Sequence, residues 1–349
     1  MAIDWSAGYS SSWRAHEVIP GTWADGGEVA GIEPARIERT RDGDAPLLES
    51  GTLNATVPIG DDWRERYVRL SMVATQGGES ERVDVATLLV SSASGDTDRG
   101  RDALGLTGRS VLWPASTGRL ESGSYAPAGA DGAAWVARLL RAHIAAPVVV
   151  TGSFRLASHV VLDLGCTPLD ASWLVLRAGG FALSIAGDGT VTIGPDPTVP
   201  ALSLDATNAR LLHTRFPRDV DWSGVPNRYV AIDGDEIAVA MNDDPNSPVS
   251  TVTRGYDHTK IDSNPVRIGG ETLLAYANRR LEEESIAYDR RTYSREWWPN
   301  VVPGDLVRAS MPTVGLEGDM RVHRQSLSCG AGIVVDEESR MEVRLWTRT

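Results

Sequence analysis

Histidine and cysteine side chains are the ones best suited to bind a metal ion or to act as nucleophiles, and in this chain they are scattered. The six histidines are His16, His143, His159, His213, His258 and His323. None is three or four residues from another, and Cys166 and Cys329 are far apart and outside any Cys-x-x-Cys motif. Because zinc sites and disulfide frameworks need clustered ligands or regular spacings, we expect no metal site, no cofactor site, no catalytic residue and no disulfide framework.

Motifs that bind phosphate groups or activate a serine are not found either. Lys260 is the only lysine and follows Tyr-Asp-His-Thr, so neither a Walker loop nor a Ser-x-x-Lys motif can form. No Gly-x-Ser-x-Gly turn occurs. The sequence therefore favours a protein that is not an enzyme.

Three pairs of aspartates could be the acids of a glycosidase or the ligands of calcium. They are Asp42/Asp44, Asp233/Asp235 and Asp243/Asp244. A glycosidase needs two carboxylates at a set separation across a cleft, and calcium needs a larger set of oxygen ligands in a fixed pattern. Each pair lies in a predicted turn, where aspartate bonds to its own backbone. We interpret all three pairs as turn residues.

Tryptophan is the most unusual part of the composition, with 11 Trp against 3 Phe. The segment Trp297-Trp298-Pro299 is the strongest aromatic feature and could stack against sugars. Tryptophan is also enriched in cores and subunit interfaces, because it combines a large apolar surface with one hydrogen-bond donor. We favour a core or interface position for these residues, and for Trp5, Trp13 and Trp23 near the N-terminus.

Length and charge limit the classes of protein that remain. The 349 residues allow two or three domains, and the 42% hydrophobic and 23% charged content is that of an ordinary globular protein. The net charge of −13 disfavours any role whose affinity comes from contacts with phosphates. A negative net charge is compatible with a channel lining along which DNA passes without adhering. It is equally compatible with a subunit that stays soluble before it joins an assembly.

No targeting or membrane segment is expected. The N-terminal sequence MAIDWSAGYSSSW lacks a basic stretch followed by an apolar run, and no stretch approaches the ~18 apolar residues of a membrane span. We therefore expect a protein that folds in a cytoplasm and has no direct membrane span.

Residues 1–120 show the pattern of β-structure. Apolar and polar residues alternate over 65–75 and again over 83–90, which predicts half-buried strands. The Gly-, Ser- and Asp-rich stretch 91–108 suggests a long loop, followed by a strand over 110–114. We therefore expect a β region over 1–120.

Residues 121–210 have the pattern of a small α/β region. Asp131 can cap one helix, and Thr167-Pro168 can open a second that Gly179-Gly180 would end. A hairpin should follow over 181–193, with Asp188-Gly189 at its turn. We therefore expect one compact region with both helices and strands here.

Residues 211–349 return to β-structure. Asp233-Gly234 predicts a hairpin between 228–232 and 236–241, and a helix is expected at about 271–287. Further strands are expected after residue 301 and over 320–346. The pattern therefore predicts a mainly β chain in which a small α+β region separates two β regions.

These features together resemble the bacteriophage tail hub, or baseplate hub, proteins of long-tailed phages, in particular those of actinobacterial phages. The likeness runs in order through most of the chain. It is carried by residues 9–23, 49–51 and 65–66, then by 165–174 and 194–197, and finally by 226–230, 242–248, 271–287 and 302–305.

The resemblance implies a structural protein of the virion tail tip. Such hubs form homotrimeric rings in which two β-barrel-like domains per subunit give pseudo-sixfold symmetry. For this chain the resemblance implies a mainly β fold with two β-barrel-like hub domains, over 1–120 and 211–349, that flank an α/β insertion over 121–210. The ring joins the hexameric tail tube or distal tail protein to a trimeric tip or fibre, contacts the tape measure protein, and lines the channel through which DNA leaves during genome ejection without specific binding. The alternatives are a tail-tip cell-wall hydrolase and a receptor-binding or glycan-binding tail protein.

Overall fold

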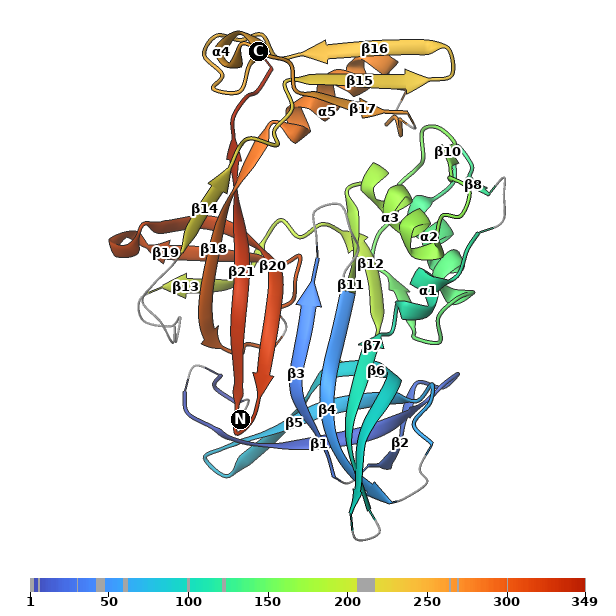
Figure 1. Ribbon diagram of the computed structural model, residues 1–349, viewed down its shortest axis with the longest axis vertical. Coiled ribbons are helices and arrows are strands. Elements are labelled where there is room, and N and C mark those ends of the chain that lie inside the picture. The colour runs from blue at the N-terminus through green and yellow to red at the C-terminus, as the bar shows by residue number, and fades with distance from the viewer. Residues whose placement is uncertain are drawn as a thin grey trace.

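Strands dominate the computed structural model, where they make up 51% of the chain against 14% for helices. The structure describes all residues except 1–2, 6, 30, 42–47, 59–61, 99–100, 121–123, 206–216, 264, 269, 300 and 349. Figure 1 shows two groups of long strands, a helical unit beside them and a small sheet at one end of the molecule. The predicted mainly β fold class is confirmed.

The first β module (residues 10–110) is one antiparallel sheet in the order β3-β4-β7-β6-β5-β1-β2. Its strands are β1 (Ser10–Ile19), β2 (Ala24–Glu28), β3 (Ile32–Thr40), β4 (Leu48–Pro58), β5 (Tyr67–Gln76), β6 (Glu79–Asp98) and β7 (Arg101–Ser110). The sheet curls so that β1 and β5 run across β3 and β4 (Figure 1). Its core contains Ile37, Leu53, Leu70 and Leu106, all essentially inaccessible to solvent.

Two predictions in this module are wrong. The expected loop over 91–108 is the continuous β6–β7 hairpin, in which Ala93 pairs with Leu106. Residues 91–96 are exposed, and their side chains show no apolar alternation that would predict a strand. They form a strand because their backbone pairs with β7. The expected strand over 110–114 is instead the end of β7 followed by helix α1 (Trp113–Thr117), where Pro114 occupies the first turn.

The α/β unit (residues 113–195) packs against the first module. It contains α1, β8 (Tyr125–Ala126), α2 (Gly132–Arg141), β9 (Val148–Val150), β10 (Val160–Val161), α3 (Pro168–Ala178), β11 (Phe181–Ile185) and β12 (Val191–Pro195). Asp131 caps α2 by accepting hydrogen bonds from the backbone of Ala133 and Ala134. Thr167 and Asp170 form a reciprocal capping box on α3. Both predicted helix starts are confirmed.

The turn between β11 and β12 explains why β5 is buried on both faces. The alternation predicted one solvent-exposed face, yet Arg69 and Ser71 are as buried as Leu70. Thr87 donates to the Gly187 carbonyl at 2.9 Å, and Arg69 donates to the Asp188 carbonyl at 3.0 Å. The α/β unit therefore covers the second face of the sheet, a contact that local alternation cannot reveal.

The second β module (residues 200–221 and 286–344) extends the same sheet. Its strands are β13 (Pro200–Asp205), β14 (Arg218–Asp221), β18 (Ile286–Glu296), β19 (Leu306–Met311), β20 (Leu316–Cys329) and β21 (Ile333–Arg344), with a short 3-10 turn η1 (Pro312–Val314). Strand β20 pairs antiparallel with β3 of the first module. The two modules thus share a 13-stranded sheet (Figure 1). The second module has a core cluster of its own, and its residues Leu327, Ile333 and Val335 also pack into the core of the first module.

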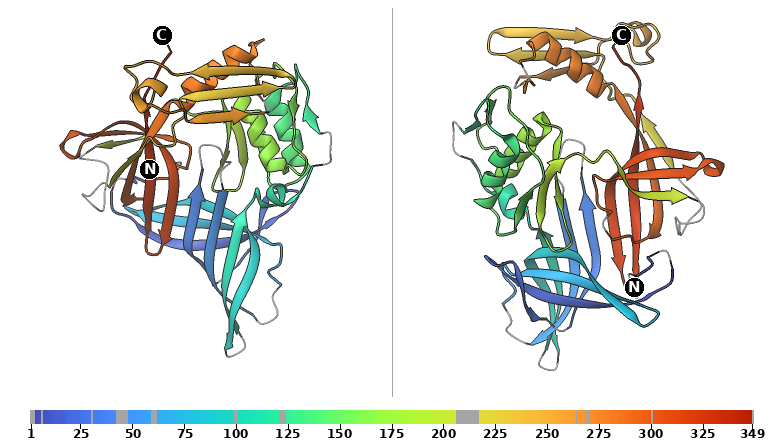
Figure 2. Two further views of the ribbon diagram at one scale, coloured as in Figure 1. Left: turned by 45° about the horizontal axis from the view of Figure 1, so that its top comes forward. Right: turned by 180° about the vertical axis from the view of Figure 1, so that it is seen from behind.

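A small-sheet unit (residues 225–284) stands at the end of the molecule furthest from the first module (Figures 1 and 2). Its sheet has the order β16-β15-β17, formed by β15 (Arg228–Asp233), β16 (Glu236–Met241) and β17 (Thr259–Asp262). Helix α4 (Thr251–Arg254) and helix α5 (Leu273–Glu284) complete it. Helix α5 is shorter than the sequence suggests, because Ser285 caps it and strand β18 begins at Ile286.

Candidate functional site

The most deeply buried charges of the second module form a closed network. Arg295 and Glu337 pair inside the barrel, with side chains 1% and 0% exposed. Tyr293 donates its hydroxyl hydrogen to Glu337 at 2.6 Å, and Gln325 donates to the same carboxylate at 2.8 Å. Burial raises the pKa of Tyr293 well above its ordinary value. Because the Glu337 carboxylate is buried and bound by these side chains, it stabilises the second module and cannot reach a substrate.

The first module contains a buried Arg–Glu pair of its own. Arg39 donates to Glu49 at 2.7 Å, and the two side chains are 5% and 2% exposed. Burial raises the pKa of Glu49, and the Arg39 charge opposes that shift. Arg39 also donates to the carbonyl oxygen of Val85. The strand register places Glu49 on β4 and Glu337 on β21, with β3 and β20 between them, so at about 4.8 Å per strand their backbone positions are roughly 14 Å apart. This exceeds the separation that a glycosidase requires of its acid pair.

The aspartate pairs named as candidates behave as turn residues where the structure describes them. Asp233 lies at the β15–β16 turn beside Gly234, whose φ is +62°, and it pairs with Arg267 at 2.6 Å. Asp244 accepts from the backbone and side chain of Asn246. Asp42 and Asp44 lie outside the described residues. The described part of the chain holds no cluster of three metal-ligating side chains.

The cysteines are unpaired and poor nucleophiles. Cys166 and Cys329 are both free and partly buried. Burial raises the pKa of both thiols, that of Cys329 to about 12. Because the thiolate is the nucleophile, the neutral thiol expected near pH 7 is unreactive.

The tryptophans named from the sequence connect parts of the chain to one another. Trp297 is 3% exposed and meets Trp5 edge to face, with ring centroids 5.8 Å apart. The indole of Trp13 donates to the Gly330 carbonyl at 2.9 Å, and that of Trp23 donates to the Asp188 carbonyl at 2.8 Å. The core interpretation of Trp297 is confirmed, and a ring this buried cannot stack against a sugar.

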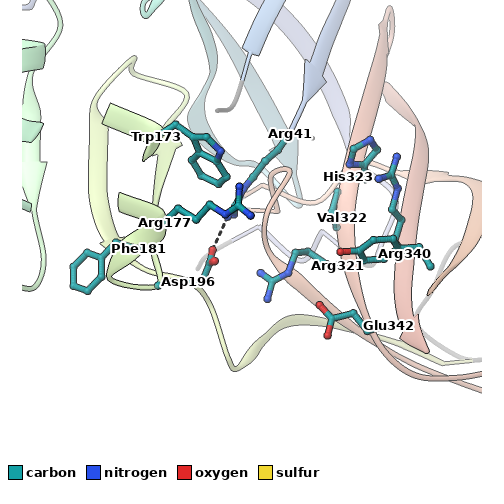
Figure 3. Close-up of a pocket in the computed structure, with 12 residues that line it drawn as sticks. Arg41, Trp173, Arg177, Phe181, Asp196, Arg321, Val322, His323, Arg340 and Glu342 are labelled. Carbon is teal, nitrogen blue, oxygen red and sulfur yellow. Dashed lines mark hydrogen bonds and ion pairs between the residues drawn. The ribbon is translucent and has the colours of Figure 1, made fainter. Parts of the chain in front are cut away.

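A polar cavity of about 230 Å³ lies where the two β modules and the α/β unit meet (Figure 3). Arg41, just beyond β3, reaches into it and pairs with Asp196 at 2.6 Å. The guanidinium carbon of Arg41 lies 5.8 Å from the ring centre of Trp173 on α3. Arg321 on β20 donates to the carbonyls of Gly304 and Pro197 at 2.6 and 3.4 Å.

The junction cavity joins the two β modules and the α/β unit, and its lining includes three groups able to take part in acid–base chemistry, Asp196, His323 and Glu342. Asp196 is paired with Arg41. Guanidinium groups do not give up protons near neutral pH, so Arg41 and Arg321 can bind but cannot act as a base. Gly304 is needed here, because a Cβ at that position would lie 2.2 Å from Arg41 Nη1. The segments 194–197 and 302–305 carry part of the resemblance described above, but no sequence pattern connects either of them with Arg41.

The chain resembles known proteins in structure and not in sequence. No protein-family model and no curated protein matches the sequence. A tail protein from Neisseria meningitidis MC58 superposes with a TM-score of 0.62 at 16% identity, over 96% of this chain and 97% of the other. The 43 kDa tail protein of prophage MuSo2 from Shewanella oneidensis gives 0.63 at 14% identity, over 95% and 98%. The chain has the fold of phage tail proteins.

A third tail-protein structure extends this result. Prophage tail protein gp18 from Listeria monocytogenes superposes with a TM-score of 0.50 at 10% identity, over 94% of each chain. The tail-protein fold therefore includes both β modules, the α/β unit and the small-sheet unit. Within the described residues, no helix has the length and apolar character needed to cross a bilayer.

Proposed function

We propose that this protein is a structural hub subunit of a bacteriophage tail tip, a component of the virion that is assembled in the host cytoplasm. Three copies would form a ring between the hexameric tail tube or distal tail protein and a trimeric tip or fibre, next to the tape measure protein. The ring would surround the channel used in genome ejection. The protein would act by its shape and would not be an enzyme.

The observation that carries this proposal is the tandem of two β modules joined edge to edge. Strand pairing between β3 and β20 fixes their relative position within one chain. Three such chains would place six β modules around an axis, so a threefold assembly could face a sixfold one. In this proposal the chain divides into barrel-like domains over 1–120 and 211–349, with the α/β insertion over 121–210.

Charge and side-chain chemistry agree with a passive channel. A net charge of −13 gives a subunit that repels DNA, so DNA could pass without binding. The buried carboxylates Glu49 and Glu337 are each paired with an arginine. The buried Trp297 cannot serve a glycan-binding face. No described feature favours the hydrolase or glycan-binding alternatives.

The position of the chain in a virion reconstruction tests the proposal. We expect density for three copies at the tail tip, between tube and fibre. Native mass measurement of the purified full chain in parallel should give particles of three times 37.5 kDa. Density at another place in the virion, or release of soluble fragments from purified cell wall by the protein alone, would overturn it.

A further inference from the structure

Strand β16 lies at the edge of the small sheet, with its outer side open. The order β16-β15-β17 places no described strand beside that side, which lies at the top of the molecule in Figure 1. Asp233 and Glu236 flank the two-residue turn of the hairpin, so this pair and every second pair after it exchange backbone hydrogen bonds. The Asn242 amide continues this alternation by donating to the Asn227 carbonyl at 2.9 Å.

The residues of β16 whose backbone points to the open side are therefore Ile237, Val239 and Met241. Their N–H and C=O groups make no backbone hydrogen bond to any described element outside the hairpin. Their side chains lie on the face that α5 leaves uncovered and are 64%, 39% and 46% exposed. A row of unpaired donors and acceptors at strand spacing is a template for one more strand. The hydrogen-bonding pattern thus selects an extended polypeptide segment as the occupant.

The edge of β16 lacks the features that protect other sheet edges in this chain. The path of the 13-stranded sheet ends at β2, with the sequence Ala-Asp-Gly-Gly-Glu, and at β14, with Arg-Asp-Val-Asp. Charged residues and glycines of this kind disfavour pairing with another chain. Strand β16 reads Glu-Ile-Ala-Val-Ala-Met, without a proline, and its pairing with β15 contains no bulge. Such an unprotected edge indicates a place where another strand binds.

Acidic residues stand at both ends of this edge. Asp235 and Glu236 precede the apolar residues and Asp243 follows them. All three are exposed, and none forms an ion pair with another described residue. The small-sheet unit as a whole, residues 225–284, has 11 Asp and Glu against 6 Lys and Arg, a net charge of −5. An incoming strand with basic residues at its two ends is therefore favoured.

The same charges disfavour a second copy of β16 as the occupant. Two β16 strands paired antiparallel about Val239 would place Asp235 of each copy opposite Asp243 of the other. Parallel pairing would align the same acidic residues side by side. Like charges directly opposite one another destabilise a pair of strands.

We propose that the open edge of β16 binds an extended segment of a different protein, which adds a fourth strand to the small sheet. The segment has alternating apolar residues between basic ends. The inference goes beyond the hub function and does not depend on it, because it concerns the small-sheet unit alone. Its failure would leave the hub function to be decided by the virion reconstruction.

The first test measures binding of a labelled peptide, Lys-Val-Thr-Val-Thr-Val-Lys, to the full chain by fluorescence polarisation. We expect saturable binding. The same peptide with proline at its central valine should bind at least about tenfold more weakly, because proline removes an N–H and cannot continue the pairing. The peptide with Glu at both ends should bind about fivefold more weakly. No binding of the Lys peptide, or equal binding of all three peptides, would overturn the proposal.

The second test changes the edge itself. Val239→Pro removes an N–H that the hairpin does not use, and edge strands tolerate proline where the N–H faces solvent. It should weaken binding of the Lys peptide at least about tenfold, since it removes a hydrogen bond and blocks the close approach of the new strand. Val239→Thr keeps the N–H and should bind within about threefold of the wild type. Equal binding by Val239→Pro and the wild type would rule out the edge as the site.

The third test reverses the charges at the two ends and does not depend on the folding of Val239→Pro. The double variant Glu236→Lys, Asp243→Lys leaves the hairpin hydrogen bonds intact and should prefer the Glu peptide to the Lys peptide by about fivefold. An unchanged preference would contradict the choice of a strand with basic ends. Native mass measurement checks for self-pairing: oligomers of the wild type that persist in Val239→Thr but are lost in Val239→Pro would identify a second copy as the occupant and overturn the proposal.

Discussion

Replacing Arg39 by methionine is the most direct test of how the first module tolerates a buried charge. Arg39 and Glu49 are joined by a 2.7 Å hydrogen bond, and neither side chain is more than 5% exposed. Arg39→Met keeps most of the side-chain volume but leaves the Glu49 carboxylate buried without its counter-charge. Removing one partner of such a pair costs about 3–5 kcal/mol. For a chain of this size, that corresponds to a fall in melting temperature of roughly 4–7 °C.

The pH dependence of this loss follows from the direction of the Glu49 pKa shift. Burial raises the pKa of Glu49 in the folded protein, and Arg39 opposes the rise. In Arg39→Met the folded pKa should rise further above the unfolded value. The folded state then binds the proton more tightly than the unfolded chain does, so stability falls as pH rises between the two pKa values. The variant should therefore lose more stability at pH 8 than at pH 5.

Urea unfolding at both pH values, followed by tryptophan fluorescence, measures these effects. The double variant Arg39→Met, Glu49→Leu supplies the control, because replacing both charges with apolar groups is often neutral or stabilising. It should recover most of the lost free energy of unfolding and should show no additional pH dependence. An Arg39→Met loss below about 1 kcal/mol, or an equal loss at pH 5 and pH 8, would refute the idea that an ionised Glu49 is left unpaired.

Three other predictions concern packing and reactivity. In Gly187→Ala the new methyl carbon would lie 1.8 Å from the Asp84 carbonyl oxygen, so the β11–β12 turn must move away from the first module. We expect a loss of about 2 kcal/mol or more in thermal unfolding, whereas Gly224→Ala, which meets open space, should match the wild type. Trp297→Ala should cost about 3–5 kcal/mol in the same assay because it removes a buried indole; stability within 1 kcal/mol of the wild type would contradict its place in the core. Cys329, with its pKa raised to about 12, should react with iodoacetamide at pH 8 at least about 100-fold more slowly in the folded protein than in urea. Peptide mass spectrometry gives both rates, and similar rates would argue against its burial.

Local signals in the sequence were sufficient for the elements that are specified locally. The capping box of Thr167 and Asp170 needs only residues three apart, and it starts α3 where predicted. The turn at Asp233-Gly234 likewise fixes the β15–β16 register through neighbouring residues. Hydrogen bonds between close neighbours depend little on the rest of the fold, so they can be predicted from a single sequence.

Features that depend on distant contacts could not be predicted in this way. Residues 91–96 form a strand because β7 pairs with them, and their own Ser, Ala and Gly side chains favour a loop. Arg41 and Asp196 are 155 positions apart, and nothing in the sequence links the segment 194–197, which contains Asp196, to Arg41. The junction cavity was missed for this reason: each of its residues is ordinary in its local sequence, and only the tertiary fold brings them together.

The pairing of β3 with β20 limits how a hub made of this chain could change shape. Five residue pairs join the two strands, from Arg324↔Thr40 to Ser328↔Arg36. On one face Leu327 and Ile37 are buried in the first module's core, and on the other Glu38 pairs with Arg324 at 3.2 Å. Separating the modules would break these backbone hydrogen bonds, at about 1 kcal/mol each, and expose the core. In the proposed ring we therefore expect each two-module sheet to move as one body if the tip opens.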